Sequence, residues 1–448
     1  MTRATIARGA FATALVLFAV AAVYRALEQD VEPAAPAPPS IPPSTAPAAA
    51  ATYQGFLFGR ITTLGGTTYE GRLRWGAGEE AFWGDFFNGS KDENPWVALV
   101  PPERLPKESR PVEIFGVRIA DNERRIDIDR PFMARFGDIG RIEARGRDVQ
   151  VTLKSGTVFH LDRFEASDFD DGVRVWDVRQ GVIDLDSLKI RAIELLPTAP
   201  LGGAPSRLHG TVRTRRGEFT GFVQWDREEC VGSDELDGRT AEGELGVRFD
   251  TIRSIERRSP DGSLVTLLDG REIVLSGTRA VGPDNRGIYV DDRRYGRVLI
   301  SWDAFERIDF SDPGSGGSGP AYGDFPPGRP LTGSVTTRAG RSLAGRLVYD
   351  LDESATTETL DARAQGVDYT IPFGLIASIV PAEPDARGAK VILHRGEELR
   401  LERSGDVGQS HGGLLVFTRD RERPEYVRWE EVQRIDLDRP PAMYPPLP

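Results

Sequence analysis

The chain has 448 residues, of which 39% are hydrophobic and 28% charged, a composition typical of a folded protein with room for several domains. Its formal net charge of −12 argues against nucleic acid and anionic lipid as general partners. Cys230 is the only cysteine, which excludes an intrachain disulfide and a cysteine-based zinc site.

Residues 1–27 have the features of an export signal. Arg3 and Arg8 precede an uncharged, mostly apolar run from Gly9 to Tyr24, and Ala19-Val-Ala21 offers a small-residue cleavage site. The run is at the short end for a membrane span, so a cleaved signal and a retained anchor both stay open. Either one places the rest of the chain outside the cytoplasm, because the positive end stays inside.

The rest of the chain is divided by segments rich in proline and small residues. Residues 28–52 are Ala/Pro-rich and predict an extended spacer. Further breaks are expected at 197–206, in the Gly/Ser/Pro linker 311–330 and in the Pro-rich tail 439–448. Between the breaks we expect three β repeats, called block one, block two and block three below, at 53–196, 207–310 and 331–438.

Each block opens with the same predicted hairpin. A turn glycine occupies the same position in the three copies (Gly66, Gly217 and Gly340), where a tight hairpin needs a positive φ. The second strand carries another glycine within an otherwise apolar face, as in Phe219-Thr-Gly-Phe-Val-Gln-Trp225. Such a glycine lets a strand bend sharply, which a small closed barrel requires.

Block one alone carries an aromatic insertion, between Gly76 and Arg110. If its rings are exposed, they would bind a protein or a sugar polymer; if they fold back, they extend the core of the block. We favour the core interpretation, because exposed apolar clusters are uncommon. The candidate binding residues are Phe82, Trp83, Phe86, Phe87 and Trp96.

One signature recurs through all three blocks: an aromatic or leucine, an apolar residue three positions later, and an isoleucine beyond it. Residues three apart eclipse in a 3₁₀ turn, and an alternating strand precedes the copy at Trp302. We therefore predict strand, tight turn, strand, in preference to the face of an amphipathic helix, because the pattern ends after seven residues. The copies begin at Phe136, Leu185, Phe249, Trp302, Phe373 and Trp429.

The first half of each block resembles an Sm-like or SH3-like small barrel. The resemblance lies in the turn glycine, the bent Gly-x-Leu-x-Trp strand, the acidic turn Asp237-Gly238 and the closing Ile371-Pro-Phe-Gly-Leu-Ile376. It implies an all-β fold of three tandem repeats, each of two small barrel modules. Sm-like proteins bind RNA through an asparagine loop and an Arg-Gly pair. This chain has Trp225-Asp-Arg-Glu and Val247-Arg-Phe-Asp at those places, so the resemblance supports the fold and not RNA binding.

Residues with reactive side chains show no shared pattern among the blocks. The four histidines, His160, His209, His394 and His411, have no second histidine or cysteine at ligand spacing, and we expect them on the surface or in loops. Asp168-Phe-Asp-Asp-Gly172 is better explained as a solvated turn than as a calcium loop, because the late glutamate is missing.

A charged motif occurs twice almost unchanged, as Arg125-Ile-Asp-Ile-Asp-Arg-Pro131 and as Arg434-Ile-Asp-Leu-Asp-Arg-Pro440. Alternating charges on one strand face indicate cross-strand ion pairs. A charged contact surface for a partner is the alternative that stays open.

We interpret the chain as a non-enzymatic bacterial envelope protein that acts as an interaction or scaffold module. The alternatives are binding of a cell-wall or carbohydrate polymer through the block-one aromatics, and a hydrolase with an acidic pair between modules. We expect no catalytic residue, metal or cofactor. The expected partner is another envelope protein or a wall polymer, not nucleic acid, and the membrane is contacted only through the N-terminal segment. The expected location is periplasmic or secreted, with or without an inner-membrane anchor.

Overall fold

The structure is a computed structural model in which the chain divides into two units, Met1–Ala46 and Pro47–Pro448. All described residues belong to the second unit: 53–76, 81–105, 107–114, 117–125, 131–163, 166–170, 172–200, 205–313, 317–382, 388–402, 405–408 and 410–440. The expected export signal and the spacer 28–52 lie outside this part of the chain. Among the helices described, none is long and apolar enough to cross a membrane.

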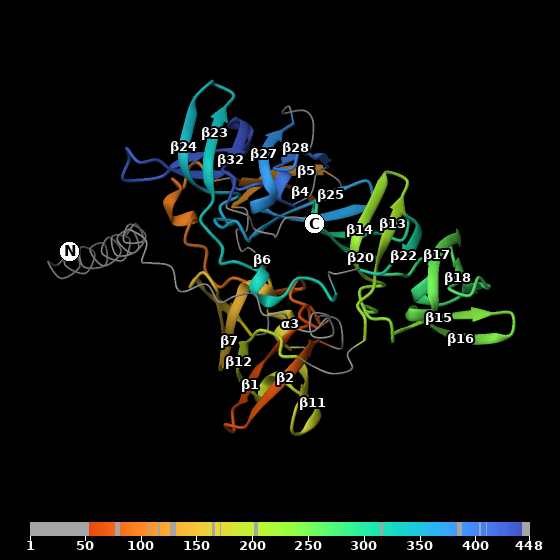
Figure 1. Ribbon diagram of the computed structural model, residues 1–448. Coiled ribbons are helices and arrows are strands. Elements are labelled where there is room, and N and C mark those ends of the chain that lie inside the picture. Colours follow the sequence, from red (N-terminus) through yellow and green to blue (C-terminus); the bar gives the residue numbers. More distant parts are fainter. Residues whose placement is uncertain are drawn as a thin grey trace. The chain divides into compact units, whose positions relative to one another are not determined.

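The all-β prediction is confirmed. The described residues form antiparallel sheets, and their only α-helix is the single turn α3, Ser167–Asp170 (Figure 1). The strands of block one are β1 Phe58–Thr63, β2 Thr68–Trp75, β3 Phe86–Ser90, β4 Lys107–Ile114, β5 Val117–Arg125, β6 Pro131–Arg135, β7 Ile139–Arg145, β8 Asp148–Leu153, β9 Val158–Asp162, β10 Val173–Asp177, β11 Gly181–Leu185 and β12 Ile190–Leu195.

Blocks two and three each have ten strands, which match those of block one without the β4–β5 hairpin. In block two they are β13 His209–Thr214, β14 Gly217–Gln224, β15 Glu235–Thr240, β16 Gly243–Arg248, β17 Ile252–Ser259, β18 Gly262–Leu267, β19 Glu272–Ser276, β20 Ile288–Asp292, β21 Gly296–Ile300 and β22 Phe305–Phe310. In block three they are β23 Thr332–Thr337, β24 Ser342–Val348, β25 Thr359–Ala364, β26 Val367–Pro372, β27 Ile376–Pro381, β28 Ala389–Leu393, β29 Glu398–Leu401, β30 Leu414–Phe417, β31 Glu425–Val427 and β32 Val432–Leu437.

The strands of a block are interleaved and do not pair in chain order. In block one the sheet order is β11-β10-β2-β1-β12-β7-β8-β9, and the same order recurs within the sheets of the other two blocks. The opening hairpin therefore pairs with strands from the end of its block, through β1–β12, β13–β22 and β23–β32. The resemblance to a small barrel implied a hairpin paired within the first half. Apolar alternation fixes the face that a strand buries, but it does not name the neighbouring strand.

The glycine inside the second strand of each hairpin is explained by this pairing. A Cβ added at Gly71 would lie 1.9 Å from the carbonyl oxygen of Trp176 on β10. In block two the equivalent distance is 2.0 Å, from Gly221 to the carbonyl oxygen of Asp291. No side chain fits at these distances, so the glycine allows the late strand of the block to approach the early one.

The tight turns predicted by the recurrent signature are confirmed at five of its six copies. These are 3₁₀ turns, and the first residue of the Phe136, Phe249 and Phe373 copies is buried. The copy at Trp302 forms a hydrogen-bonded turn instead, in which Ser301 O accepts from the backbone N–H groups of Ala304 and Phe305. The turns are η2 Phe136–Asp138, η3 Ser187–Lys189, η4 Phe249–Thr251, η8 Phe373–Leu375 and η10 Trp429–Glu431.

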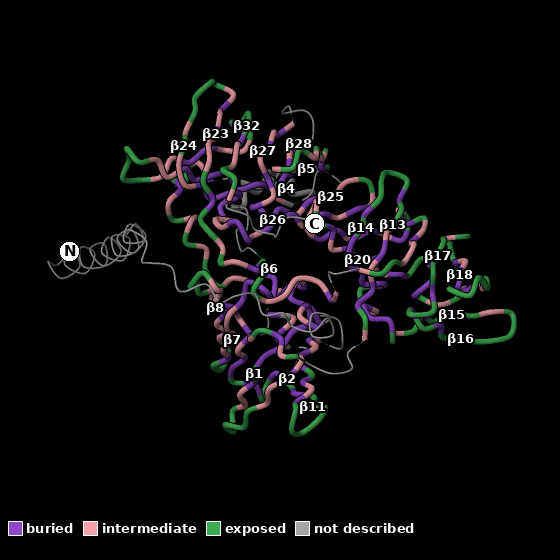
Figure 2. Tube along the Cα trace, in the orientation of Figure 1, coloured by how far each residue is buried: buried purple, intermediate pink, exposed green. Residues whose placement is uncertain are grey.

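The blocks contact one another through defined elements. The sheet of block two continues into block three, because β21 pairs with β26. The segment 311–330, expected to be a linker, also packs on block one where it is described: the Phe325 side chain is buried in the block-one core. A Cβ at Gly137 would lie 2.3 Å from the Phe325 ring, so the glycine makes room for that ring. Purple in Figure 2 marks the buried positions along the strands.

Candidate functional site

The aromatic insertion of block one is buried. Phe82, Trp83, Phe86 and Phe87 are at most 8% exposed, and Trp96 is half-buried. The four buried rings cannot contact a wall polymer, and of the five candidate residues only Trp96 keeps partly exposed surface. The structure therefore supports the core interpretation of the insertion.

Trp83 shows how the insertion is fixed. Its indole Nε1 donates to Gln54 O at 3.0 Å and to Thr198 Oγ1 at 3.1 Å, which joins the two ends of block one. Its ring packs on Tyr322 with 4.6 Å between ring centroids. Tyr322 in turn donates its hydroxyl to Ile139 O at 2.8 Å, so the ring also holds the segment 317–330.

A buried ionic cluster connects the insertion to block two. The Arg297 guanidinium bonds Asp85 at 2.5 Å and Asp291 at 2.8 Å, and Arg207 bonds Asp291 at 2.6 Å. Burial raises the pKa of Asp291, but the neighbouring Arg297 and Arg207 lower it, and the net shift is downward. Arg207 also lies over the Phe82 ring, 3.8 Å from its centroid. Charge and aromatic surface of the insertion therefore stabilise a junction between two blocks.

A second contact connects the insertion to block three. Lys91 Nζ lies 2.6 Å from Asp352 and 3.6 Å from Glu358. Burial lowers the pKa of Lys91, but the neighbouring carboxylates raise it, and the net shift is upward. Asn94 adds a hydrogen bond from Nδ2 to Leu351 O at 2.9 Å. One insertion thus holds both of the following blocks.

His411 lies in the loop between η9 Gly405–Val407 and β30, one of the two expected locations, but its side chain is buried and not at the surface. The imidazole stacks on Trp429 with 4.0 Å between centroids and 9° between planes. Its Nδ1 lies 3.4 Å from Asp350, and its edge meets Tyr349. A substrate cannot reach side chains as buried as Asp350 and His411, so we interpret this cluster as a polar anchor within the core of block three.

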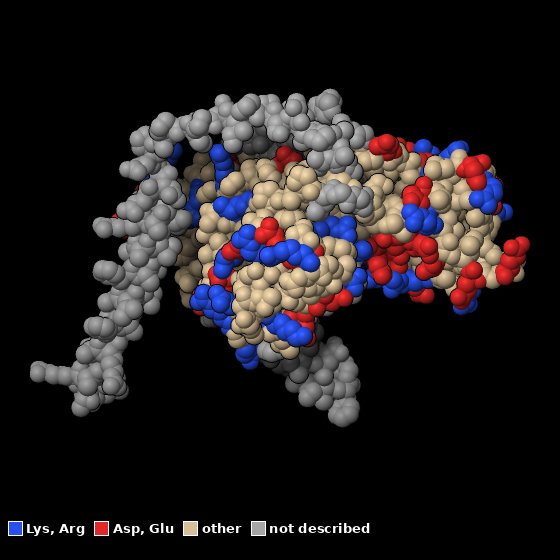
Figure 3. Space-filling model, turned by 60° about the horizontal axis from the view of Figure 1, so that its bottom comes forward, with Lys and Arg blue, Asp and Glu red and all other residues tan. Residues whose placement is uncertain are grey.

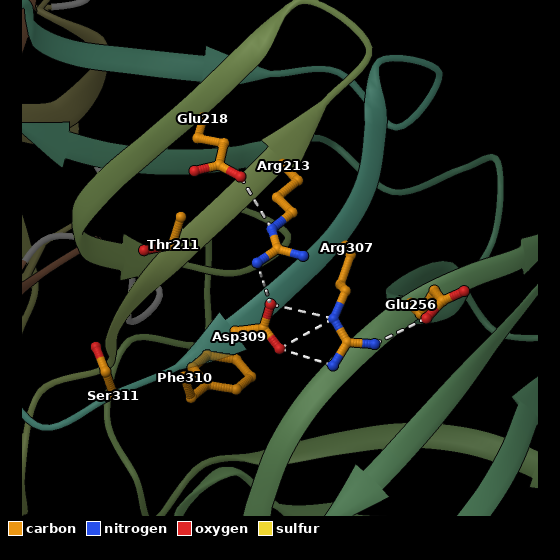
Figure 4. A pocket seen from close by; sticks show the side chains of 8 residues that line it. All are labelled: Thr211, Arg213, Glu218, Glu256, Arg307, Asp309, Phe310 and Ser311. Atoms are coloured by element: carbon orange, nitrogen blue, oxygen red, sulfur yellow. Dashed lines mark hydrogen bonds and ion pairs between the residues drawn. The ribbon is translucent and has the colours of Figure 1, made fainter.

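Block two carries an exposed group of charged side chains, which line a shallow pocket of about 700 Å³ (Figure 4). Its floor is the outward face of β13, β14, β17 and β22, where arginine and carboxylate side chains alternate from strand to strand. Figure 4 shows how two arginines bridge three carboxylates. The pocket is lined by Thr211, Arg213, Glu218, Glu256, Arg307, Asp309, Phe310 and Ser311.

The charged side chains of this pocket form a continuous row, called the ladder below. Arg213 lies 3.1 Å from Glu218 and 3.6 Å from Asp309, and Arg307 lies 2.7 Å from Asp309 and 2.8 Å from Glu256. Each charged side chain lies next to one of opposite charge. About half of the Arg213 and Glu256 side chains is exposed to solvent. The row therefore presents ordered, alternating charge to the solvent, which suits docking of a complementary protein surface.

A similar row of ion pairs lies on the equivalent strands of block one. Arg60 pairs with Glu70 and Glu194, and Arg141 pairs with Glu194 and Glu143. Figure 3 shows acidic and basic side chains next to one another on the visible face of the molecule. Two blocks thus carry similar alternating rows on equivalent strands, although the two arginines occupy different positions in each block.

The sequence predicts this chemistry only in part. The repeated Arg-Ile-Asp motif indicated cross-strand ion pairs, but Arg434 pairs with Asp436 along its own strand, at 2.7 Å. Residues 126–130 of the other copy lie outside the described part. The ladder residues Arg307 and Asp309 belong to the same Arg-Ile-Asp pattern, so an alignment of the last strands of the blocks would have found them. In the part of the chain that the structure describes, no group of His, Cys, Asp and Glu is arranged to hold a metal.

Glu229 in block two should make stability depend on pH. Burial raises the pKa of its carboxyl from 4.5 to about 8, and Oε2 has no hydrogen-bond partner among the described residues. Between these values the folded protein keeps a proton that the unfolded chain has lost. The free energy of unfolding should therefore fall as the pH rises from about 5 to 8.

Thermal unfolding of Glu229→Gln at several pH values tests this prediction. We expect a smaller fall of the melting temperature with pH in the variant than in the wild type. Other buried carboxyls contribute to the remaining fall, among them Glu353, whose pKa burial also raises. The exposed Glu235→Gln is the matched control and should keep the wild-type slope. An unchanged slope in Glu229→Gln would contradict the prediction.

Comparison with protein families, with curated proteins and with solved structures finds no match for this chain.

Proposed function

We propose that the chain is a non-enzymatic interaction scaffold of the bacterial envelope. It consists of three repeated β units, each of two small interleaved barrel-like modules, exported by the N-terminal segment 1–27. The export part of the proposal comes from the sequence: a positive start, an apolar run and a small-residue cleavage site.

One observation carries the scaffold proposal: the most distinctive side chains of block one are used to hold the blocks together. Asp85 bonds Arg297 of block two, and Lys91 bonds Asp352 of block three. The segment 317–330, which connects blocks two and three, packs Phe325 into block one. These contacts restrict movement of the blocks, which suits a protein that presents several docking faces at fixed spacing.

We propose the ladder as the face that docks a partner. Its charges are exposed, ordered by their neighbours and matched by a similar row in block one. Exposed ion pairs contribute little to stability, about 0–1 kcal/mol each, so a row of them is better explained by recognition than by folding. Alternating charge selects a partner of complementary pattern and rejects others by like-charge contact.

The test is chemical crosslinking in the host cell, followed by identification of the captured proteins. The informative variant inverts the whole block-two ladder: Arg213→Glu, Glu218→Arg, Asp309→Arg, Arg307→Glu and Glu256→Arg. Every pair within the ladder keeps opposite charges, so the fold is retained, whereas the pattern shown to a partner is reversed. We expect the wild type to capture a defined set of envelope proteins and the inverted variant to lose it.

The matched control exchanges an exposed ion pair outside the ladder, Asp269→Arg with Arg271→Asp, in the β18–β19 turn. It should capture the same proteins as the wild type. A reporter enzyme fused at the C-terminus, active only outside the cytoplasm, tests export. An inverted ladder that captures the wild-type set, or a reporter confined to the cytoplasm, would contradict the proposal.

A further inference from the structure

The junction between blocks two and three is a pairing of two β-strands. The ninth strand of block two, β21, pairs with the fourth strand of block three, β26. The register places Val298 opposite Tyr369 and Leu299 opposite Asp368. Val298 and Tyr369 are both buried there, so the pairing covers apolar surface from each block.

The equivalent strands elsewhere in the chain are open. With the β4–β5 hairpin left out of the count, the ninth strand of block one is β11, and the fourth strand of block two is β16. Each lies at the end of its sheet with no further partner among the described residues. Both are mostly exposed, as the green colouring in Figure 2 shows, with Val182 on β11 57% exposed and Leu245 on β16 39% exposed. Open apolar edge strands are surfaces that natural proteins normally cover.

The ninth strand of block three is not open in the same way. On β31, the carbonyl oxygen of Tyr426 accepts a hydrogen bond from Arg104 Nη1 at 3.2 Å. Apolar residues of the block-one insertion, among them Val100 and Leu105, pack beside it. The chain therefore protects this edge with its own residues. The fourth strand of block one, β6, pairs only with β3 but is mostly buried, so among the described strands β11 and β16 are the exposed pair of one ninth and one fourth strand.

We propose that β11 of one copy of this chain pairs antiparallel with β16 of a second copy, repeating the β21–β26 junction between molecules. This inference goes beyond the proposed function, because it requires neither export nor an envelope partner. Main-chain hydrogen bonds of an added strand supply the affinity of such contacts, and opposed side chains set the register.

The internal junction fixes the register between the copies. By the position of each strand in its block, Val182 lies opposite Gly246, Ile183 opposite Leu245, and Asp184 opposite Glu244. The Ile183 and Leu245 pair buries apolar surface, as Val298 and Tyr369 do. The two carboxylates weaken the contact, although Asp184 is bonded by Arg174 at 2.7 Å and Glu244 by Arg239 at 3.2 Å.

This charge opposition gives a test that is specific for the register. In sedimentation equilibrium, Asp184→Lys should strengthen self-association of the full chain by about two- to tenfold, because the introduced ammonium group then faces the carboxylate of Glu244. Glu244→Lys should do the same. The double variant Asp184→Lys, Glu244→Lys restores like charges and should return the affinity to about the wild-type value.

Cysteine crosslinking provides a second readout that does not depend on affinity. Cys230 is buried, so cysteines introduced by Ile183→Cys and Leu245→Cys should form a disulfide between copies under mild oxidation. The out-of-register pair Val182→Cys with Leu245→Cys is the control and should crosslink far less. A closed dimer and a growing chain of copies both support the proposal. A monomer at every concentration with no crosslink, or equal effects of the single and double lysine variants, would overturn it.

Discussion

Replacing Arg297 with methionine is expected to lower the free energy of unfolding by about 3–5 kcal/mol. The guanidinium is buried and satisfies two carboxylates, Asp85 from block one and Asp291 from block two. Methionine fills a similar volume but leaves buried Asp85 without its counter-ion and leaves Asp291 with Arg207 alone. Asp85 is also held by the backbone N–H groups of Ala81 and Phe82, so it cannot turn away to solvent. Urea unfolding followed by tryptophan fluorescence measures the loss.

The matched control is Arg307→Met on the exposed ladder. Arg307 also bridges two carboxylates, Asp309 and Glu256, but water replaces the lost contacts, so the expected loss is about 1 kcal/mol or less. Adding Asp85→Asn to Arg297→Met should recover part of the loss, because it removes one uncompensated charge. Equal losses at Arg297 and Arg307 would show that the buried cluster does not hold the junction between blocks.

Trp83→Ala is expected to cost about 3–5 kcal/mol, as truncation of a large core side chain does. The ring is fully buried, and its removal also breaks the hydrogen bonds to Gln54 and Thr198. Loss of the contact with Tyr322 should loosen the segment 317–330, so proteolysis there should become faster. Chemical unfolding measures the stability, and limited proteolysis with mass spectrometry locates the new cleavage.

Trp96→Ala tests the same insertion at a half-buried position. Trp96 contacts Phe417 at 6.2 Å between ring centroids and packs at the edge of the cluster with block three. The expected loss is smaller than for Trp83, because less apolar area leaves the protein interior. A similar small loss in both variants would mean that the insertion does not belong to the core.

The sequence predicted the elements of the fold better than their partners. Strand alternation, turn glycines and the three-residue signature identified the hairpins and the tight turns. They did not reveal that β1 pairs with β12, because the hydrophobic pattern of a strand is the same whichever neighbour it has. Gly71 contained a hint, since an interior glycine indicates close approach of another backbone as well as a bend.

The contacts between blocks were harder to predict for a different reason. Arg297 and Asp85 are single charged residues far apart in the chain, and nothing local distinguishes them from surface charges. The glycines, serines and prolines of the segment 311–330 predict a linker, and Tyr322 and Phe325 stand among them. The segment connects two blocks and also packs on a third, and a composition rich in glycine, serine and proline predicts only the first of these roles.

The pairing of the first strand of each block with its last also affects how the protein is made. Strand β13 cannot form its hydrogen bonds with β22 until β22, almost a whole block later, has left the ribosome or the export channel. Contacts between such distant residues form slowly, because a long loop must close first. One side of the first strand of a newly made block therefore stays unpaired, and accessible to holding chaperones, until the final strand arrives. Stop codons placed just before β22 or β32 should consequently release chains that aggregate or are degraded, whereas a stop just after a closing strand should leave the preceding block folded.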